Sequence, residues 1–543
     1  MKKILLYYPP TTIDKLADTD NFPLSVLSLC TLIDTKKYEI CIEYGFDDSR
    51  NKLLGEVEEA VCLGISIMTG TQIKHAVSLA KQIRARRADL PIVFGGYHAS
   101  ALPEETLMSP YADIVIRGYG EVVFKNLINA LENKESLETV EGISFCSGDV
   151  ICHNKNAPIP KLDNLPSMPY HLLDVQGYFA KNTLRNIPYI SSRGCPHQCG
   201  FCADYVIYKR RWNALSAERV VNDLSWIKEN YSPELIRIID SNFFVDEKRV
   251  IKICKGLLDK KIQLRFTKLN GDAHLMSRFS DETFRLMRDA GIENILIGVE
   301  SGSAKALACI HKRASKEETL DVSMRLRKGG ISIGHSLILG FPYDLPRAQM
   351  EEEHRREFIM TMKYVYELNS FRVPGDYYLL FNFTPYPGVS LYERYLKLGY
   401  VPPKTLEGWA EINLNTYPTP WLGQRAERWA VDCRKLAYFF SGKCERTWQN
   451  YQHFRFQWFL SKPVYDKLVA AVCRAINKLL YKRLNKGLLQ MPFPLKAWYG
   501  VERFYFHGRR GDQNMRLSTI AVKAIGFYCG LLIDNTKRKL QRG

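Results

Sequence analysis

The stretch RGCPHQCGFCADY, residues 193–205, decides how the rest of the chain is interpreted. It places three cysteines, Cys195, Cys199 and Cys202, within eight positions, and no further cysteine follows before Cys254. Glycine and proline residues flank these thiols, which is typical of a tight loop and unusual for cysteines that only fill a core. The spacing therefore predicts a site that needs three thiolates and leaves out a fourth.

Thiolates in the pattern C-x3-C-x2-C can bind a soft metal, and two kinds of site fit it. A structural zinc site would need His197 as its fourth ligand. Closed zinc sites normally take their ligands from two separated pairs, whereas His197 lies between the first two cysteines. A [4Fe–4S] cluster ordinarily takes four thiolates, so three leave one iron open. The pattern favours the cluster and predicts that a substrate or cofactor coordinates the open iron.

Composition and charge narrow the class of protein. The chain has 543 residues, 46% of them hydrophobic and 25% charged, which indicates several globular domains. Fourteen cysteines over this length are too sparse for a disulfide scaffold, and MKKILLYYPP is typical of a first strand rather than a signal peptide. We therefore expect a cytoplasmic protein with reduced thiols.

The pattern of strands and helices divides the chain into four regions. Residues 1–140 alternate apolar runs with amphipathic helices, which predicts an open, doubly wound, Rossmann-like α/β domain. Residues 141–186 are irregular and rich in proline, and are interpreted as a linker. Residues 187–415 contain about six strand–helix units, which predict a partial (β/α) barrel. Residues 416–543 are aromatic and basic, and are predicted to form a mainly helical C-terminal domain.

The cysteine loop resembles the signature of the radical S-adenosylmethionine (SAM) superfamily, in which an aromatic residue, here Phe201, directly precedes the third cysteine. The resemblance implies a loop after the first strand of a partial (β/α)6 barrel, and IPYISS lies where that strand is expected. It also implies that Cys195, Cys199 and Cys202 hold a [4Fe–4S] cluster whose open iron is chelated by SAM. Reductive cleavage of SAM would then yield a 5′-deoxyadenosyl radical.

Further segments resemble family motifs in the expected order. GVESGS resembles the fourth-strand segment that contacts the ribose and methionine parts of SAM, and LGFP resembles the segment near adenine. IIDSNFF, around Asp240 and Asn242, is a weaker match to a second-strand segment. TPYPGVSLYE, residues 384–393, is expected to form a loop over the barrel mouth, either as a turn or as a substrate contact. The SAM contacts implied by these matches are Phe201, Glu300, Ser301, Gly302, Gly340, Phe341 and Pro342.

The N-terminal domain resembles the cobalamin (B12)-binding domain found in one branch of this superfamily. The implied contacts are Ser66 and Met68 after the third strand and Gly95 and Gly96 after the next, where small residues permit close approach of a ligand. RGYGE, residues 117–121, fits a strand-end loop of the same branch. The cobalt-binding Asp-x-His-x-x-Gly motif is absent, as in the branch that resembles anaerobic magnesium-protoporphyrin IX monomethyl ester cyclases and hopanoid-modifying enzymes. We expect cobalamin without the usual histidine lower ligand, and His98 in a loop near the corrin.

The last part of the chain carries nearly all of the excess positive charge. The formal net charge is +18, and residues 421–543 hold 24 Lys and Arg against 7 Asp and Glu. The segment YDKLVAAVCRAINKLLYKRLNKGL predicts a basic amphipathic helix, which favours peripheral contact with the inner face of a membrane. The alternative, helices that cover the barrel with their charges in solvent, stays open. We expect no nucleic acid partner because no recognised module is present. The predicted apolar face of this helix consists of Leu468, Val472, Ile476, Leu479 and Leu480.

Together these patterns predict a cobalamin-dependent radical SAM enzyme that methylates or oxidatively cyclises its substrate at an unactivated carbon. Two alternatives remain: a radical SAM enzyme without functional cobalamin, and a non-catalytic, membrane-attached metal-binding scaffold. The expected partners are a small-molecule substrate, lipid-like or a tetrapyrrole, and a low-potential electron donor of the flavodoxin or ferredoxin type. No spacing argument selects a catalytic acid, base or hydrogen donor.

Overall fold

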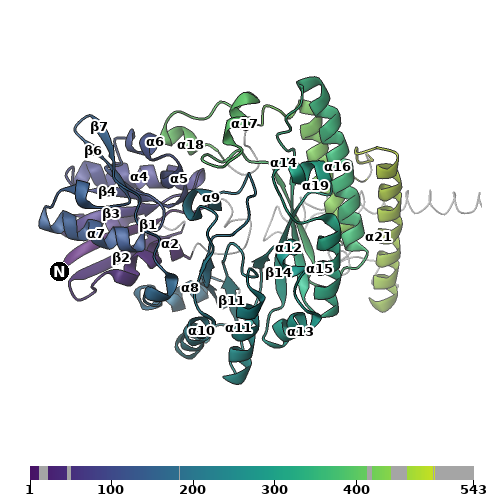
Figure 1. The fold of residues 1–543 in the computed structure, drawn as a ribbon, viewed down its shortest axis with the longest axis horizontal. Coiled ribbons are helices and arrows are strands. Elements are labelled where there is room, and N and C mark those ends of the chain that lie inside the picture. Colours follow the sequence, from purple (N-terminus) through teal and green to yellow (C-terminus); the bar gives the residue numbers. More distant parts are fainter. Residues whose placement is uncertain are drawn as a thin grey trace, which may run out of the picture. The chain divides into compact units, whose positions relative to one another are not determined.

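The computed structural model describes residues 1–11, 22–45, 50–182, 184–412, 419–441, 462–492 and 495. The chain divides into two compact units, Met1–Met350 with Phe371–Leu422 and Glu351–Ser370 with Gly423–Gly543. The first unit contains two α/β bodies, an N-terminal sheet and an arc of barrel strands (Figure 1). The predicted α/β fold class is confirmed.

The N-terminal body is a seven-stranded sheet with the order β2-β1-β3-β4-β5-β6-β7. The first five strands pair in parallel, and β6 and β7 are antiparallel. The strand order changes direction between β1 and β3, and in such sheets ligands bind beyond the carboxyl ends of the strands at this point. The strands are β1 (Lys2–Tyr8), β2 (Tyr38–Tyr44), β3 (Ala60–Ser66), β4 (Ile92–Gly95), β5 (Ile114–Ile116), β6 (Ile143–Ser147) and β7 (Val150–His153).

Helices cover both faces of this sheet because successive strand residues point to opposite sides. Ile4 and Leu6 of β1 share one hydrophobic cluster with α2 (Leu24–Leu29) and α7 (Glu121–Asn133). Helix α4 (Thr71–Arg86) buries Ile73, Leu79 and Ile83, none of which belongs to that cluster, as expected for a helix on the opposite face. The remaining helices of this body are α3 (Arg50–Gly55), α5 (Gly96–Ala101) and α6 (Pro103–Leu107).

The region predicted to be an irregular linker contains regular structure. Strands β6 and β7 form a hairpin that pairs with β5 in the register Ile114↔Phe145. The hairpin turns at Gly148, whose φ of 59° is readily adopted only by glycine. The structure therefore differs from the predicted linker over Ile143–His153, and helix α8 (Val175–Lys181) follows before the barrel begins.

The second body is an arc of six parallel strands, one of them interrupted. Strands β12 and β13 are two parts of the third strand, separated where Lys268 adopts a φ of 57°. All pairings along the arc are parallel, which matches the predicted partial (β/α)6 barrel. The strands are β8 (Asn186–Tyr189), β11 (Leu235–Ile238), β12 (Arg265–Phe266), β13 (Leu269–Gly271), β14 (Asn294–Glu300), β15 (Ser332–Leu339) and β16 (Tyr377–Asn382).

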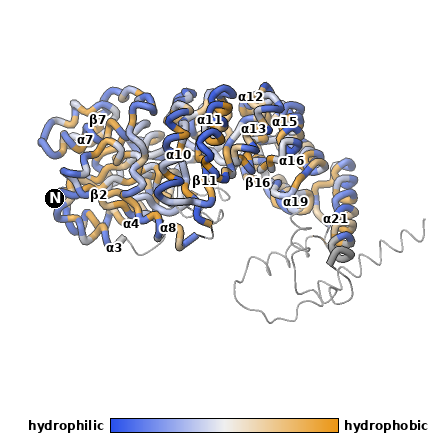
Figure 2. Tube along the Cα trace, turned by 90° about the horizontal axis from the view of Figure 1, so that it is seen from below, coloured by the Kyte–Doolittle hydropathy of each residue, from blue (hydrophilic) through white to orange (hydrophobic). Residues whose placement is uncertain are grey.

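Six barrel helices begin at a serine or aspartate whose side chain accepts a hydrogen bond from the first turn. Such a cap typically stabilises a helix by about 1 kcal/mol, and it fixes the loop that enters the helix. Hydrophobic and hydrophilic residues alternate along α11 in Figure 2, as expected for a helix that buries one face and exposes the other. The capped helices are α10 (Ala217–Tyr231), α11 (Glu247–Asp259), α12 (Ala273–Met276), α13 (Asp281–Asp289), α14 (Ala304–Cys309) and α15 (Lys316–Lys328).

A segment that follows the last barrel strand returns to the N-terminal body. The Tyr97 hydroxyl donates a hydrogen bond to the Pro387 carbonyl over 2.6 Å. Helix α18 (Leu406–Trp409) contributes Trp409, which is fully buried and donates through Nε1 to Glu105 over 2.8 Å. These contacts, one before helix α17 (Tyr392–Lys397) and one after it, hold the two bodies together.

The second unit is helical where it is described. Helix α16 (Arg347–Asn369) enters it, and α19 (Gln424–Phe440) packs against α21 (Lys462–Asn485). Tyr366 and Tyr481 stack with ring centroids 4.1 Å apart. Within the described ranges, no helix has the length and apolar character needed to cross a membrane.

Helix α21 confirms the predicted helix but presents a different apolar face. Leu479, predicted on that face, is 39% exposed. Residues three or four positions apart lie on the same face of a helix, and the buried face of α21 does not include position 479. The predicted face residue Leu468 and the tryptophans 448, 458 and 498 lie outside the side chains that are described. The residues buried on α21 are Val469, Cys473, Ile476, Leu480 and Leu484.

Candidate cofactor sites in the barrel and the N-terminal body

The three cysteines of the loop line one pocket beside the barrel. The loop runs from β9 (Ser192–Arg193), which pairs with β10 (Asn213–Ala214), to α9 (Asp204–Tyr208). The pocket has a volume of about 40 Å³ and is lined by Cys195, Cys199 and Cys202 together with residues such as Tyr205 and Ser390. Gly200 holds the loop in place, because its N–H donates to the Ile310 carbonyl over 2.8 Å and its carbonyl accepts from Leu391 N over 3.1 Å.

Burial governs the acidity of these thiols. It raises the pKa of Cys195, raises that of Cys199 to about 11, and raises that of Cys202 further above its usual range. A bound metal removes such protons outright, so the thiols are suited to a metal centre rather than to free thiolate chemistry. Among the described residues, no three His, Cys, Asp or Glu side chains meet around a single ion. A [4Fe–4S] cluster does not require this, because each thiolate binds a different iron.

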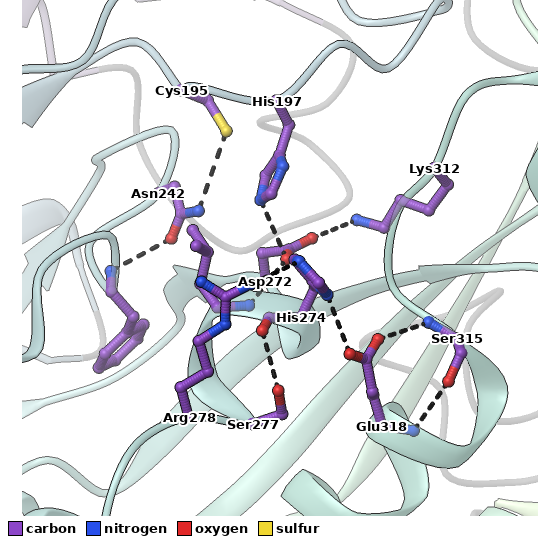
Figure 3. A network of polar contacts seen from close by, with 12 residues as sticks. Cys195, His197, Asn242, Asp272, His274, Ser277, Arg278, Lys312, Ser315 and Glu318 are labelled. Atoms are coloured by element: carbon purple, nitrogen blue, oxygen red, sulfur yellow. Dashed lines mark hydrogen bonds and ion pairs between the residues drawn. The ribbon is translucent and has the colours of Figure 1, made fainter.

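A chain of buried charges lies beneath the cysteine loop (Figure 3). His197 Nε2 is 3.0 Å from Asp272 Oδ1, and Lys312 Nζ is 2.8 Å from Asp272 Oδ2. Lys312 Nζ is also 4.0 Å from Glu300 Oε1, and each of these side chains is less than 10% exposed. His197, the candidate fourth zinc ligand, therefore pairs with a carboxylate in this structure.

The two carboxylates in this chain of charges have pKa values that are shifted in opposite directions. Burial would lower the pKa of Lys312, but the attraction of Asp272 and Glu300 outweighs it and raises the pKa. Burial acts to raise the pKa of Asp272, yet Lys312 and His197 hold it well below its usual range. Burial raises the pKa of Glu300 to about 7, against a lowering by Lys312. Asp272 is thus the fixed anion, and Glu300 changes charge near neutral pH.

Asn242 and Asp240, on the weakly matched second-strand segment, have different environments. Asn242 Nδ2 is 3.9 Å from Cys195 Sγ, and Asn242 Oδ1 accepts from Phe244 N over 3.1 Å (Figure 3). Asp240 is fully buried and accepts hydrogen bonds from the hydroxyls of Ser191 and Ser192, each over 2.6 Å. Asp240 therefore joins the ends of β8 and β11, whereas Asn242 reaches the cysteine loop.

The predicted SAM contacts of the fourth strand lie next to the buried charges. Glu300 adopts a φ of 61°, which is rare for a residue other than glycine, where the register of β14 and β15 shifts. A non-glycine residue held in this region points to a functional constraint. Ser301 is fully buried and its hydroxyl accepts from Ser303 N over 3.1 Å, which fixes the turn through Gly302.

The predicted contacts near adenine share one aromatic cluster. The rings of Phe201 and Phe341 both lie near that of Phe383, with centroids 6.5 Å and 5.6 Å away. Trp421 Nε1 donates to the Gly340 carbonyl over 3.0 Å, and Cys309 Sγ donates to the Pro342 carbonyl over 3.5 Å. Phe341 and Phe383 are fully buried, so the partly exposed Phe201 is the ring of this cluster that could stack with a purine.

The predicted cobalamin contacts lie side by side at the carboxyl ends of β3 and β4. Ser66 pairs with Gly95 in the register of these strands, and Ile67 N donates to the Gly95 carbonyl. A Cβ atom on Gly96, whose φ is 87°, would lie 2.8 Å from the Ile67 carbonyl oxygen. Met68 is 40% exposed at the same edge. The backbone of this edge is therefore closely packed around Gly96, whereas the side chain of Met68 is exposed to solvent.

His98 is not the loop residue that was expected. It lies in the first turn of α5, is fully buried, and its Nδ1 is 2.9 Å from the Thr69 hydroxyl. Its ring packs edge-on to that of Trp409, with centroids 5.5 Å apart. Burial lowers the pKa of His98 to about 3, so the ring is neutral. The expectation of a loop failed because α5 begins directly at Gly96, without a loop after β4.

Three functional candidates escaped the sequence patterns. Asp272 and Lys312 come from different βα loops, and only the closed arc brings them to His197. Phe383 joins the aromatic cluster from β16's end without any motif of its own. Asp272 did carry one usable signal, since an aspartate that caps a barrel helix lies at the mouth of the barrel.

Comparison with known proteins defines the class. Residues 17–128 match the B12 binding domain family, and residues 189–349 match the radical SAM superfamily. The first match spans β2 to β5 of the N-terminal sheet, and the second spans the barrel strands from β11 to β15. The chain therefore contains a B12-binding domain followed by a radical SAM domain, as its motifs predicted.

Three relatives match more than half of this chain. An uncharacterized methyltransferase of Pyrococcus horikoshii is 28% identical over 400 residues, 72% of this chain and 82% of the relative. An anaerobic magnesium-protoporphyrin IX monomethyl ester cyclase of Synechocystis sp. is 24% identical over 63% of this chain and 68% of the relative. A hopanoid C-3 methylase of Methylococcus capsulatus is 26% identical over 54% of this chain and 55% of the relative.

One solved structure has a similar fold. It is the cobalamin-dependent S-adenosylmethionine radical enzyme OxsB with aqua-cobalamin and S-adenosylmethionine bound. The two share 16% identity with a TM-score of 0.65, and the match covers 100% of this chain and 81% of OxsB. The domain boundaries predicted at residues 140, 186 and 415 and the individual site residues stay predictions.

Proposed function

We propose that this chain binds a [4Fe–4S] cluster through Cys195, Cys199 and Cys202, SAM at the barrel mouth and cobalamin at the N-terminal body, and modifies an unactivated carbon of a small molecule. The observation that supports this most directly is the cysteine pocket above the pair formed by Lys312 and Glu300. When bound, the cluster would supply the electron that cleaves SAM to a 5′-deoxyadenosyl radical.

The residues near the pocket suit the chemical groups of SAM. A sulfonium and an ammonium group are cations, and ionised Glu300 presents a buried carboxylate to them. Phe201, which is partly exposed and backed by the buried Phe383, would receive the adenine. Asp272 neutralises the charge of Lys312, so that Lys312 would not repel a cationic ligand bound in front of it.

Anaerobic reconstitution tests the cluster and SAM. Protein loaded with iron and sulfide should produce 5′-deoxyadenosine from SAM and dithionite, and Cys199→Ala should abolish this activity. Cys146→Ala is the matched control, since Cys146 is exposed on β6 outside the loop, and it should retain wild-type activity. Equal activity of Cys199→Ala and wild type would contradict the proposal, as would SAM binding without cleavage in the loaded protein.

Cobalamin is tested separately from SAM cleavage. The visible spectrum of protein purified after incubation with hydroxocobalamin should show the bound corrin. A protein that cleaves SAM yet retains no corrin would instead be a radical SAM enzyme without functional cobalamin. Metal binding without SAM binding would favour the non-catalytic scaffold.

Methyl transfer is favoured over cyclisation as the reaction, because the relative from Pyrococcus horikoshii, with 82% of its length matched, is named a methyltransferase. Enzyme incubated with SAM labelled in its methyl group and reduced cobalamin should form labelled methylcobalamin. A cyclase would cleave SAM but leave the label in methionine. The substrate class proposed is a lipid-like or tetrapyrrole molecule, and flavodoxin or ferredoxin should replace dithionite as the electron donor.

The described part of the basic region supports an electrostatic membrane contact. Lys467, Arg474, Lys478, Lys482 and Lys486 are exposed on or just beyond α21, while the apolar face of the helix is buried within its own unit. Each such cation contributes about 1 kcal/mol at an anionic lipid surface. The protein should float with phosphatidylglycerol vesicles at low salt and be released at high salt. Flotation with neutral vesicles, or none at low salt, would contradict this contact.

A further inference from the structure

We infer that Arg193 and Glu121 form a positioning pair that couples the N-terminal body to the cysteine loop. Arg193 precedes Gly194 and Cys195, and Glu121 begins helix α7 directly after the strand-end loop of β5. Arg193 NH2 lies 2.5 Å from Glu121 Oε1, and the side chains are 14% and 1% exposed. The inference rests on the proposed cobalamin and cluster sites.

The pair is favoured by its position in the fold. Glu121 is the first residue of α7, where the helix dipole stabilises a carboxylate. The Arg193 guanidinium also lies over the Tyr119 ring, 5.5 Å from its centroid. Removal of either partner would leave the other charge buried without compensation, so the contact holds its geometry tightly.

A continuous path of contacts leads from the pair to the first cysteine. The Tyr119 ring packs edge-on to Tyr208, with centroids 5.5 Å apart. Tyr208 and Arg211 in turn enclose Gly194: a Cβ atom at this position would lie 2.8 Å from Tyr208 Cβ and 2.1 Å from the Arg211 carbonyl oxygen. Gly194 has a φ of 78°, so the turn into Cys195 depends on this enclosure. Movement of the strand-end loop of β5 would therefore be transmitted to the cysteine loop.

The pair also borders a small cavity. Arg193 and Glu121 line this cavity of about 50 Å³, together with Ser28 and Thr31 of the N-terminal body. Within the described residues, Glu121 Oε2 is buried and has no hydrogen-bond partner. A ligand that presents amide or hydroxyl donors at this edge, as the periphery of a corrin does, would satisfy that oxygen and fix the pair. Binding of cobalamin would then reduce the motion that the cluster site must lose when it is loaded. The two binding events would thus be linked by a coupling free energy.

Hydrogen exchange measured by mass spectrometry tests the coupling in the full, anaerobically reconstituted protein. Hydroxocobalamin should slow exchange in the peptide spanning residues 193–212, by about 5-fold or more if the coupling is of ordinary size. Arg193→Gln and Glu121→Gln should lose this response, and Arg193→Lys should retain part of it. The electron paramagnetic resonance spectrum of the reduced cluster should respond to hydroxocobalamin in wild type and not in Arg193→Gln.

The matched control is Arg84→Gln, which breaks the pair between Arg84 NH2 and Asp113 Oδ2, 2.6 Å apart and within the N-terminal body alone. It should keep the response of residues 193–212. A wild-type protein that binds hydroxocobalamin without any change in that peptide overturns the inference, even if the variants fail to fold. So does a response that persists in Arg193→Gln. Failure of hydroxocobalamin to bind at all overturns the proposed cobalamin site itself.

Discussion

The N-terminal body and the barrel use the carboxyl ends of parallel strands in different ways. At the ends of β3 and β4 the backbone is closely packed around Gly96, and the nearby buried imidazole of His98 is neutral. At the barrel mouth, Asp272, Lys312 and Glu300 are charged groups that are buried together. In the proposed function, the first edge would select its ligand by shape and the second by charge. A large amide-rich corrin suits the first, and a cationic sulfonium suits the second.

The largest expected effect comes from the removal of the barrel cation. Lys312→Met should lower the free energy of unfolding by about 3–5 kcal/mol, because it leaves Asp272 and Glu300 buried without their cation. Urea denaturation of the apoprotein measures this. The control is Arg265→Met, which breaks a pair with Glu293 that is 57% and 28% exposed and should cost less than about 1 kcal/mol. Equal effects of the two substitutions would show that the barrel mouth is not organised by charge.

The steric character of the N-terminal edge is tested at its glycines. Gly96→Ala should destabilise the protein by about 3 kcal/mol, since the new Cβ meets backbone in addition to the cost of a positive φ. Gly118 has a similar φ of 80° but nothing within 4 Å of a built Cβ, so Gly118→Ala isolates the backbone cost of about 1 kcal/mol. Thermal unfolding compares the two variants. If Gly118→Ala is as harmful as Gly96→Ala, close packing does not define this edge.

One buried histidine in each body should make stability depend on pH in the same direction. Burial lowers the pKa of both His98 and His335 to about 3, against about 6.5 in the unfolded chain. The unfolded state therefore binds more protons between these values, and stability is lost as pH falls below 6.5. Each histidine should account for about 2 kcal/mol at pH 5.

Denaturation between pH 7 and pH 5 measures this dependence. His98→Asn and His335→Asn should each flatten the profile, and the exposed His171→Asn should leave it unchanged. A profile as steep in both buried-site variants as in wild type would contradict the assignment of neutral, buried rings.

The smallest expected effect concerns ligand binding at the barrel. Burial raises the pKa of Glu300 to about 7, so its carboxylate ionises as pH rises through neutrality. Affinity for SAM should strengthen by about 10-fold between pH 6 and pH 8, because only the ionised form attracts the cation. Isothermal titration of the reconstituted protein measures this, and Glu300→Gln should bind weakly at both pH values. A pH-independent affinity in wild type would indicate that SAM does not contact Glu300.

Much of the fold was predictable because its signals are local. The three cysteines, the alternation of strands with helices and the glycines after β4 each lie within a few residues of sequence. The chain of buried charges was not predictable in this way, since His197, Asp272 and Lys312 are brought together only by closure of the strand arc. Prolines around residues 158–169 concealed the hairpin of β6 and β7, whose turn at Gly148 is a short and weak signal.

The packing of the segment after the barrel against the N-terminal body has a consequence for domain exchange. Trp409 and Glu407, which follow the barrel in sequence, are bound by Glu105 and Ser109 of the N-terminal body. A chimera that replaces only the first 140 residues with those of a relative would leave an indole and a carboxylate facing a foreign surface. Grafts that carry residues 384–412 along with the donor's N-terminal body should keep this joint intact, so the module that evolution can exchange is discontinuous in sequence.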